Sequence, residues 1–341
     1  MISSGIHTPN VASKHVNVNG KNSRYNNSHS LEFDGTDDYA ECTLSSDIFN
    51  KANGTISLWC IFDSRGTKLL FNAHNSSDGN ADFFRITSQG ITGNSLDGVT
   101  GVDCLLAQYT TTLSGTRVAN TAQAMQSSSF HGHGHTRKSN NFSASTGGSG
   151  FGNEHVALRI TSDMDASTWF HIVYTWDTSE TFTPTKQTSA SAYITPTEIT
   201  GAMRLYVNGV LKQHGQSGPA SNNQIKATGG FSEMTASLDT IRLGLNHNLA
   251  SDHDGHMNNV AVWNSRLTDA EVLAIYNSGT PTDLRLNSGN YVSASNLVGY
   301  WTMQDGHGAG DYETYKTVFD RSVNNNHLTL VNNTVWTTVT P

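Results

Sequence analysis

The sequence predicts an all-β protein, a two-sheet antiparallel sandwich with one short helix and long inserted loops. Branched apolar residues alternate with other residues in short runs, as at Ile241, Leu243 and Leu245. A period of two is typical of strands that bury one face. The hydrophobic content is 35% and lies mostly in such runs, which is enough for a thin core between two sheets.

One segment has a helical period instead. Thr268 and Glu271 have the spacing of a capping box, in which each side chain bonds to the backbone N–H of the other residue. Leu267 and Val272 are placed for a hydrophobic staple across the first turn. We expect the helix to end before Gly279 and the proline two residues later.

Residues 203–212 are predicted to form a β-hairpin. Asn208 and Gly209 lie between two alternating apolar runs. Both central residues of a type I′ turn take positive φ, and Asn-Gly tolerates this best. The turn signal is therefore local and needs no comparison with other proteins.

Several segments resemble, in the same order, the strands of laminin-G-like, concanavalin A-like jelly-roll domains. They are residues 31–39 (LEFDGTDDY), 55–59 (TISLW), 169–177 (WFHIVYTWD), 203–212 (MRLYVNGVLK) and 239–276. The resemblance covers roughly residues 31–331, with interruptions. It implies the jelly-roll form of the two-sheet sandwich.

A further family segment, residues 296–306 followed by 319–330, usually precedes the first strand but here follows the helix. This order resembles that of jelly-roll proteins encoded by tailed bacteriophages, especially marine ones. Only 11 residues remain after Leu330, too few for a second domain. We therefore expect this segment to add strands to the same sandwich, near the first strand.

We divide the chain into an N-terminal arm, residues 1–30, and one jelly-roll domain, residues 31–341. The arm has few apolar residues, so it is either a disordered tail or a segment ordered by a neighbouring subunit. The domain carries polar insertions at about residues 75–154, 178–201 and 214–237. Long loops of this kind often bind partners.

Composition argues against several classes of protein. The net charge is -8 and the pI is about 6.0, so there is no basic stripe for nucleic acid. No stretch is apolar enough to span a membrane, and the first ten residues lack the features of a secretory signal. The three cysteines are too few for a disulfide framework, and Cys42 and Cys60 are expected to be buried thiols.

A histidine run lies inside the first insertion. His131, His133 and His135 alternate with glycines, and in an extended segment their side chains would point the same way and could bind a transition metal. The run loosely resembles the His-x-His strands that bind iron in trimeric phage fibres. The alternative is a solvated glycine-rich loop.

Calcium is the second metal to consider, because many domains of this family bind it at the sandwich rim. Candidate ligands are Asp252 and Asp254 in one loop, and Asp163 and Asp165 in another. The acidic pair that usually begins the following strand is replaced by two asparagines, residues 258–259. The alternative for the four acids is ordinary Asx turns and solvation.

Catalysis has little support in the sequence. Retaining glucanases of this fold need two carboxylates roughly 5 Å apart, usually written Glu-x-Asp-x-x-Glu, and no such run exists here. A Gly-x-Ser-x-Gly motif is also missing. Tryptophans in strand-like runs are expected in the core, whereas Trp336, near the C-terminus, is expected to contact a partner.

We therefore expect a non-enzymatic bacteriophage virion protein, namely a capsid decoration, head-fibre or tail-fibre protein that displays a lectin-like surface. It would be made in the host cytoplasm, join other virion proteins through its arm, form a homo-oligomer such as a trimer, and bind a host surface glycan. The alternative is a secreted or surface bacterial carbohydrate-binding protein or glycan hydrolase of the concanavalin A-like fold.

Overall fold

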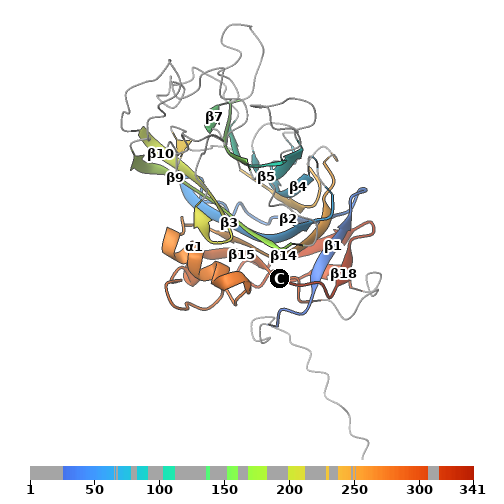
Figure 1. Cartoon of the computed structure of the whole chain (residues 1–341). Helices are drawn as coiled ribbons and strands as arrows, with labels where there is room; N and C mark the ends of the chain where they lie inside the picture. Colours follow the sequence, from blue (N-terminus) through green and yellow to red (C-terminus); the bar gives the residue numbers. More distant parts are fainter. Residues whose placement is uncertain are drawn as a thin grey trace, which may run out of the picture.

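The computed structural model confirms the predicted fold class, since two antiparallel β-sheets pack face to face and, among the residues that the structure describes, carry one short α-helix (Figure 1). The structure describes residues 26–64, 66, 68–77, 83–90, 103–111, 136–138, 152–159, 168–182, 199–211, 228–229, 237–246, 249, 251–305 and 315–341. In this part of the chain, no helix is long and apolar enough to cross a membrane.

Each sheet has nine strands within the described ranges. In sheet A the order is β11 (Val210–Leu211), β10 (Ile199–Val207), β9 (Phe170–Phe182), β3 (Asn53–Phe62), β14 (Asp254–Trp263), β1 (Ser30–Asp34) and β18 (Val335–Thr337), with β12 (Thr228–Gly229) on β10 and β15 (Leu297–Trp301) on β14. In sheet B the order is β16 (Thr317–Val318), β17 (Leu328–Val331), β2 (Tyr39–Thr43), β13 (Thr240–Leu243), β4 (Lys68–His74), β5 (Phe83–Gly90), β6 (Asp103–Thr111), β8 (Gly152–Arg159) and β7 (Thr136–Lys138).

The main core lies between the two sheets. Alternation decides which side chains enter it, so that Ala40 and Cys42 of β2 and Ile241 and Leu243 of β13 all point inward. Burial of each branched side chain contributes about 1.5–3 kcal/mol. Cys42 and Cys60 are free and buried, as predicted, and burial raises the pKa of Cys42 to about 12, which keeps the thiol protonated.

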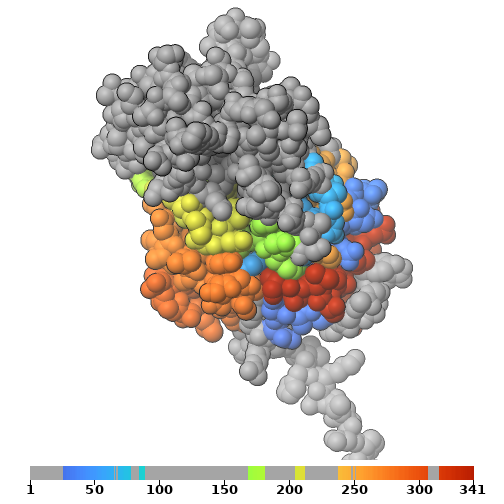
Figure 2. All heavy atoms as spheres, in the orientation of Figure 1, coloured from blue at the N-terminus to red at the C-terminus, as the bar shows by residue number. Residues whose placement is uncertain are grey.

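A second apolar layer covers the outer face of sheet A. It is formed by helix α1 (Asp269–Tyr276), the 3-10 helices Asn277–Gly279 and Ala294–Asn296, and the chain leading to β15. Trp263, Val272, Ile275 and Tyr291 are buried there. In Figure 1 α1 lies on the opposite side of β3 from β4 and β5, and in Figure 2 an orange patch covers the lower left of the visible surface, beside red atoms of the C-terminal segment.

The predicted capping box is present at the start of α1. The Thr268 hydroxyl accepts from the Glu271 N–H at 3.2 Å, and the Thr268 N–H donates to the Glu271 carboxylate at 3.0 Å. The helix ends at Tyr276, before Gly279 as predicted. Its C-cap is Asn277, which tolerates the left-handed conformation (φ 46°) and whose N–H bonds to the Leu273 carbonyl.

Substitution of both Thr268 and Glu271 by alanine is expected to lower the free energy of unfolding by about 1–2 kcal/mol at pH 7. Burial raises the pKa of Glu271, but hydrogen bonds from Ser293 and Thr268 outweigh it and hold the pKa below its usual value. This stabilisation is therefore lost as the pH falls through the folded-state pKa. Urea unfolding of wild type and variant should show a smaller difference at pH 3 than at pH 7, and an equal difference would contradict the assignment.

Two further predictions from the sequence are confirmed. Asn208 and Gly209 both have positive φ, 53° and 74°, as a type I′ turn requires. The C-terminal segment adds strands to the same sandwich, since β18 pairs with β1 and β17 pairs with β2. The register places Trp336 opposite Leu31.

The expectation that the insertions are loops needs correction. Strands β5, β6 and β7 lie within residues 75–154 and extend sheet B, while β9 and β10 continue into residues 178–201. Aromatic and branched residues, as in Phe83-Phe-Arg-Ile-Thr, favour a strand wherever a neighbour offers a backbone ladder.

The described part of the arm contacts the sandwich. Ser30 begins β1, and the backbone N–H groups of Ser28 and His29 donate to the Gln304 side chain at 2.6 and 3.1 Å. Residues 1–25 lie outside the described residues, so the assembly role of the arm stays a prediction.

Candidate functional site

The outer faces of the two sheets differ in character. An apolar layer covers the outer face of sheet A, whereas the outer face of sheet B carries polar side chains. In β2 and β13 the residues between the core positions are Glu41 and Arg242, and in β4 and β5 they include Asn72 and Arg85. Sheet B is therefore the candidate binding face.

Four of these residues form a lateral row across the sheet, here called the polar row: Glu41, Arg242, Asn72 and Arg85. Each is the direct cross-strand partner of the next, so all four lie on one face. Neighbouring strands are roughly 4.8 Å apart. The same register continues through three further polar residues, Gln108, His155 and Arg137.

Arg242 is held rigidly within the row. Its Nε donates to the Glu41 carboxylate at 2.7 Å, and its Nη1 donates to the Asn246 carbonyl at 2.8 Å. The guanidinium also lies 4.8 Å from the centre of the Tyr39 ring. An arginine fixed by an ion pair and a ring is preorganised, so little side-chain entropy is lost when it binds a ligand.

Two buried atoms of this face lack a hydrogen-bond partner. Asn72 is 0% exposed, and its Nδ2 donates to His74 Nδ1 at 3.0 Å, but its Oδ1 is unsatisfied. The hydroxyl of Thr87, 3% exposed, is also unsatisfied. Each such atom costs about 1–3 kcal/mol of stability.

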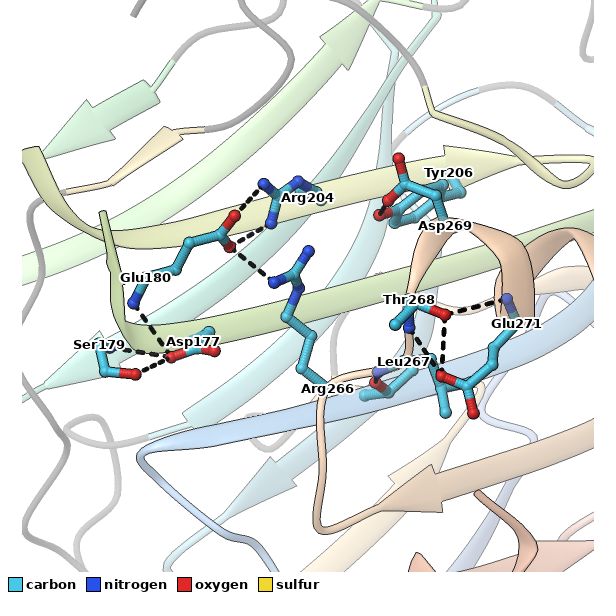
Figure 3. Close-up of polar contacts among 11 residues, drawn as sticks. Asp177, Ser179, Glu180, Arg204, Tyr206, Arg266, Leu267, Thr268, Asp269 and Glu271 are labelled. Carbon is cyan, nitrogen blue, oxygen red and sulfur yellow. Dashed lines mark hydrogen bonds and ion pairs between the residues drawn. The ribbon is translucent and has the colours of Figure 1, made fainter. Parts of the chain in front are cut away.

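A second polar cluster, on the outer face of sheet A, is structural (Figure 3). Glu180 of β9 accepts two hydrogen bonds from the guanidinium of Arg204 of β10. A second arginine forms an ion pair with the same carboxylate, since Arg266 Nη1 lies 3.0 Å from Glu180 Oε2. The Tyr206 hydroxyl donates to Asp269, the first residue of α1, at 2.7 Å. These contacts join α1 and the preceding loop to β9 and β10, so the Glu180 carboxylate is already occupied.

Buried carboxylates elsewhere in the described ranges also hold backbone in place. Asp38 accepts from the N–H groups of Asp34 and Asn333 at 3.0 and 2.8 Å. Asp320 accepts from three N–H groups and one hydroxyl, and Glu271 caps α1. Such carboxylates stabilise the fold and are poorly suited to proton transfer.

The aspartates predicted as calcium ligands fall into two groups. Asp252 accepts from the Asp37 N–H at 3.3 Å, and Asp254, the first residue of β14, lies 4.0 Å from the Lys68 ammonium. Asp163 and Asp165 lie outside the described residues. Where the structure is described, no three His, Cys, Asp or Glu side chains are grouped to hold a metal ion, and calcium binding stays a prediction.

His131, His133 and His135 also lie outside the described residues, so a transition-metal site there stays a prediction. The expectation for Trp336 is corrected. Its side chain is 1% exposed in the core between the sheets, and its Nε1 donates to the Tyr315 carbonyl at 2.8 Å. Alternation along β18 points this residue inward, so it cannot meet a partner on the surface.

Five tryptophans in strand-like runs are expected in the core. Trp59, Trp176, Trp263 and Trp301 are buried, as predicted, whereas Trp169 is only half-buried and lies just before β9. The asparagines that replace the family's acidic pair, Asn258 and Asn259, lie in the middle of β14. The pairing of β14 with β3 shifts register at this point. The part of β14 before the shift pairs with β1, the part after it pairs with β15, and Asn259 has φ 46°. The pair therefore forms a β-bulge, which tolerates asparagine well.

Sequence reasoning missed the polar row. Its local signal is visible, because Arg242 and Arg85 interrupt apolar runs at alternate positions. However, the row joins residues from four separate strands, and their relative register cannot be derived from alternation alone.

No protein-family model matches the chain, and no curated protein matches it. Solved structures give distant likenesses. A heptameric SAP-like pentraxin from Limulus polyphemus is 15% identical over 74% of this chain and 84% of its own, with a TM-score of 0.38. A protein from Bacteroides ovatus described as carbohydrate-binding is 12% identical over 93% of this chain and 61% of its own, with a TM-score of 0.43.

A third likeness is to the CBM40 of the Ruminococcus gnavus IT-sialidase, bound to alpha2,3 sialyllactose. It is 12% identical over 72% of this chain and 96% of its own, with a TM-score of 0.37. Sequence identities and TM-scores this low do not indicate which ligand this protein binds.

Proposed function

We propose that the protein is a lectin-like, non-enzymatic binding protein that recognises a glycan through the outer face of sheet B. The polar row is the observation that carries this proposal. Sugars offer hydroxyl groups that both donate and accept hydrogen bonds, and they suit a face of polar side chains that the sheet holds in register. The resemblance of the sequence to lectin-like jelly rolls supports the same reading.

Hydrolysis is the less favoured alternative. Four of the described carboxylates, Asp38, Glu180, Glu271 and Asp320, are each engaged in contacts that hold the backbone or an arginine. The sequence also lacks the spaced acids of retaining glucanases. Binding without cleavage is therefore the better proposal.

The substitution Arg242→Gln tests this function. We expect it to weaken binding to immobilised bacterial envelope polysaccharide by about tenfold, since hydrogen bonds of charged groups are worth about 1.5–3 kcal/mol. The control is Arg285→Gln, which removes the same charge from an ion pair with Asp283 in the layer over sheet A and should leave binding unchanged. No reducing sugar should be released. Equal loss in both variants, or sugar release by the wild type, would refute the proposal.

We further propose that the protein is displayed on the virion of a tailed bacteriophage as a homo-oligomer, attached through its arm. The order of its sequence segments supports this. A chain without residues 1–25 is expected to unfold with unchanged cooperativity, because β1 begins at Ser30, but to be missing from purified particles. Calorimetry and immunoblots of particles would measure both properties. Normal incorporation of the truncated chain would contradict the role of the arm.

A further inference from the structure

We propose that Phe319, exposed at the edge of sheet B, is the stacking platform for a neutral sugar, and that His327 and Thr329 bind the hydroxyl groups of that sugar. This inference rests on the proposed function and deepens it, because it names the class of sugar and a second part of the same face. It follows from the register of the edge strands, the exposure of the ring and the neutral polar groups beside it.

The register of the polar row continues to the edge of sheet B. Thr329 of β17 is the cross-strand partner of Glu41, and Thr317 of β16 is the partner of Thr329. Arg242 is therefore three strand spacings from Thr317, about 14 Å, and Phe319 is two residues beyond Thr317, roughly 7 Å along the chain. A face of this length suits an oligosaccharide rather than a single sugar.

Phe319 points away from the core. Its neighbour Val318 and the cross-strand partner Leu328 are buried between the sheets, so alternation places Phe319 and His327 on the outer face. The two rings meet edge to face, with centroids 5.1 Å apart. The Arg321 guanidinium also lies 5.6 Å from the Phe319 ring centre, yet Phe319 is 44% exposed. The ring is therefore accessible to the apolar C–H face of a sugar.

The ring and the imidazole are held in place before any ligand binds. The Phe319 N–H donates to the Asp305 carboxylate at 3.0 Å, and the Asp320 N–H donates to His327 Nδ1 at 3.0 Å. Because Nδ1 accepts a hydrogen bond, the proton of the neutral imidazole is on Nε2, which can donate to a sugar hydroxyl. His327 is exposed, and preorganised groups of this kind lose little entropy on binding.

The groups near the ring favour a neutral ligand. Arg242 is paired with Glu41, and Arg321 is paired with Asp305, so both arginines already have a carboxylate partner. Thr329 is exposed on β17 and offers a hydroxyl that both donates and accepts. A neutral sugar matches this combination, because it has an apolar face for the ring and hydroxyl groups for the threonine and the imidazole.

The test is the substitution Phe319→Leu, which removes the ring but keeps an apolar side chain. Affinity for a neutral oligosaccharide should fall about fivefold, as expected for one aromatic stacking contact, and Phe319→Trp should restore it. The melting temperature should change little, because Phe319 is largely exposed. Thr329→Val should also weaken binding about fivefold, as expected for one lost hydrogen bond.

Trp169→Leu is the matched control. Trp169 is a half-buried aromatic residue just before β9, in sheet A, and its loss should not change affinity. Weaker binding by Trp169→Leu, with unchanged binding by Phe319→Leu, would place the ligand on sheet A and overturn both this inference and the proposed function.

Isothermal titration calorimetry of the full chain would use cellohexaose, laminarihexaose and maltohexaose as neutral probes and oligogalacturonate as the acidic probe. We expect binding of at least one neutral probe, unaffected by added salt. Binding of the acidic probe alone would overturn this inference and leave the proposed function standing. The same holds if Phe319→Leu binds as the wild type does while Arg242→Gln binds more weakly. Binding of no probe, and of no bacterial envelope polysaccharide, would overturn both.

Discussion

Replacement of Gly255 by alanine is expected to lower the free energy of unfolding by about 3 kcal/mol or more. Gly255 lies in β14 with φ 138°, a region that side chains rarely allow. A Cβ there would lie 2.1 Å from the Ile61 carbonyl oxygen, and this clash is with backbone of β3 that cannot turn away. Urea unfolding followed by tryptophan fluorescence would measure the loss.

Gly289→Ala is the matched control for this prediction. Gly289 also has positive φ, 57°, but a Cβ there would meet no atom within 4 Å. The cost should be limited to the left-handed backbone, about 1–2 kcal/mol. Similar losses at the two glycines would show that the approach of β14 to β3 is not the cause.

Substitution of Asp320 by alanine is expected to lower the free energy of unfolding by about 3 kcal/mol or more. The Asp320 carboxylate accepts from the N–H groups of Tyr300, Ser322 and Asn326 at 2.8–2.9 Å, and from the Ser322 hydroxyl at 2.9 Å. Removal of the carboxylate leaves buried donors unsatisfied, at about 1–3 kcal/mol each. Because the contacts join β15 of sheet A to the chain before β17 of sheet B, the C-terminal strands should also become sensitive to protease.

Asp252→Ala provides the comparison for Asp320. Asp252 accepts one long hydrogen bond, 3.3 Å from the Asp37 N–H, at the exposed rim. Its loss should change stability by no more than about 0.5 kcal/mol. Limited proteolysis and urea unfolding of the two variants should therefore differ clearly. A resistant, fully stable Asp320→Ala protein would show that other contacts hold the C-terminal strands.

The sequence by itself determined the features that depend on neighbours along the chain. Alternation identified strands outside the predicted insertions, Thr268 and Glu271 identified the start of the helix, and Asn208-Gly209 identified the hairpin. These signals are short-range, because they arise from backbone conformations and caps within a few residues. The absence of a disulfide pattern likewise agreed with the buried thiols Cys42 and Cys60.

Only the tertiary structure decided what depends on distant segments. Trp336 lies in the core because β18 pairs with β1 in one register, and a shift by one residue would have pointed it outward. Likewise, Glu41, Arg242, Asn72 and Arg85 form one row only because β13 aligns between β2 and β4, which are far from it in the sequence. Register between strands is set by packing of the whole core, a long-range property that local patterns do not encode, and for this reason the candidate binding face emerged from the fold.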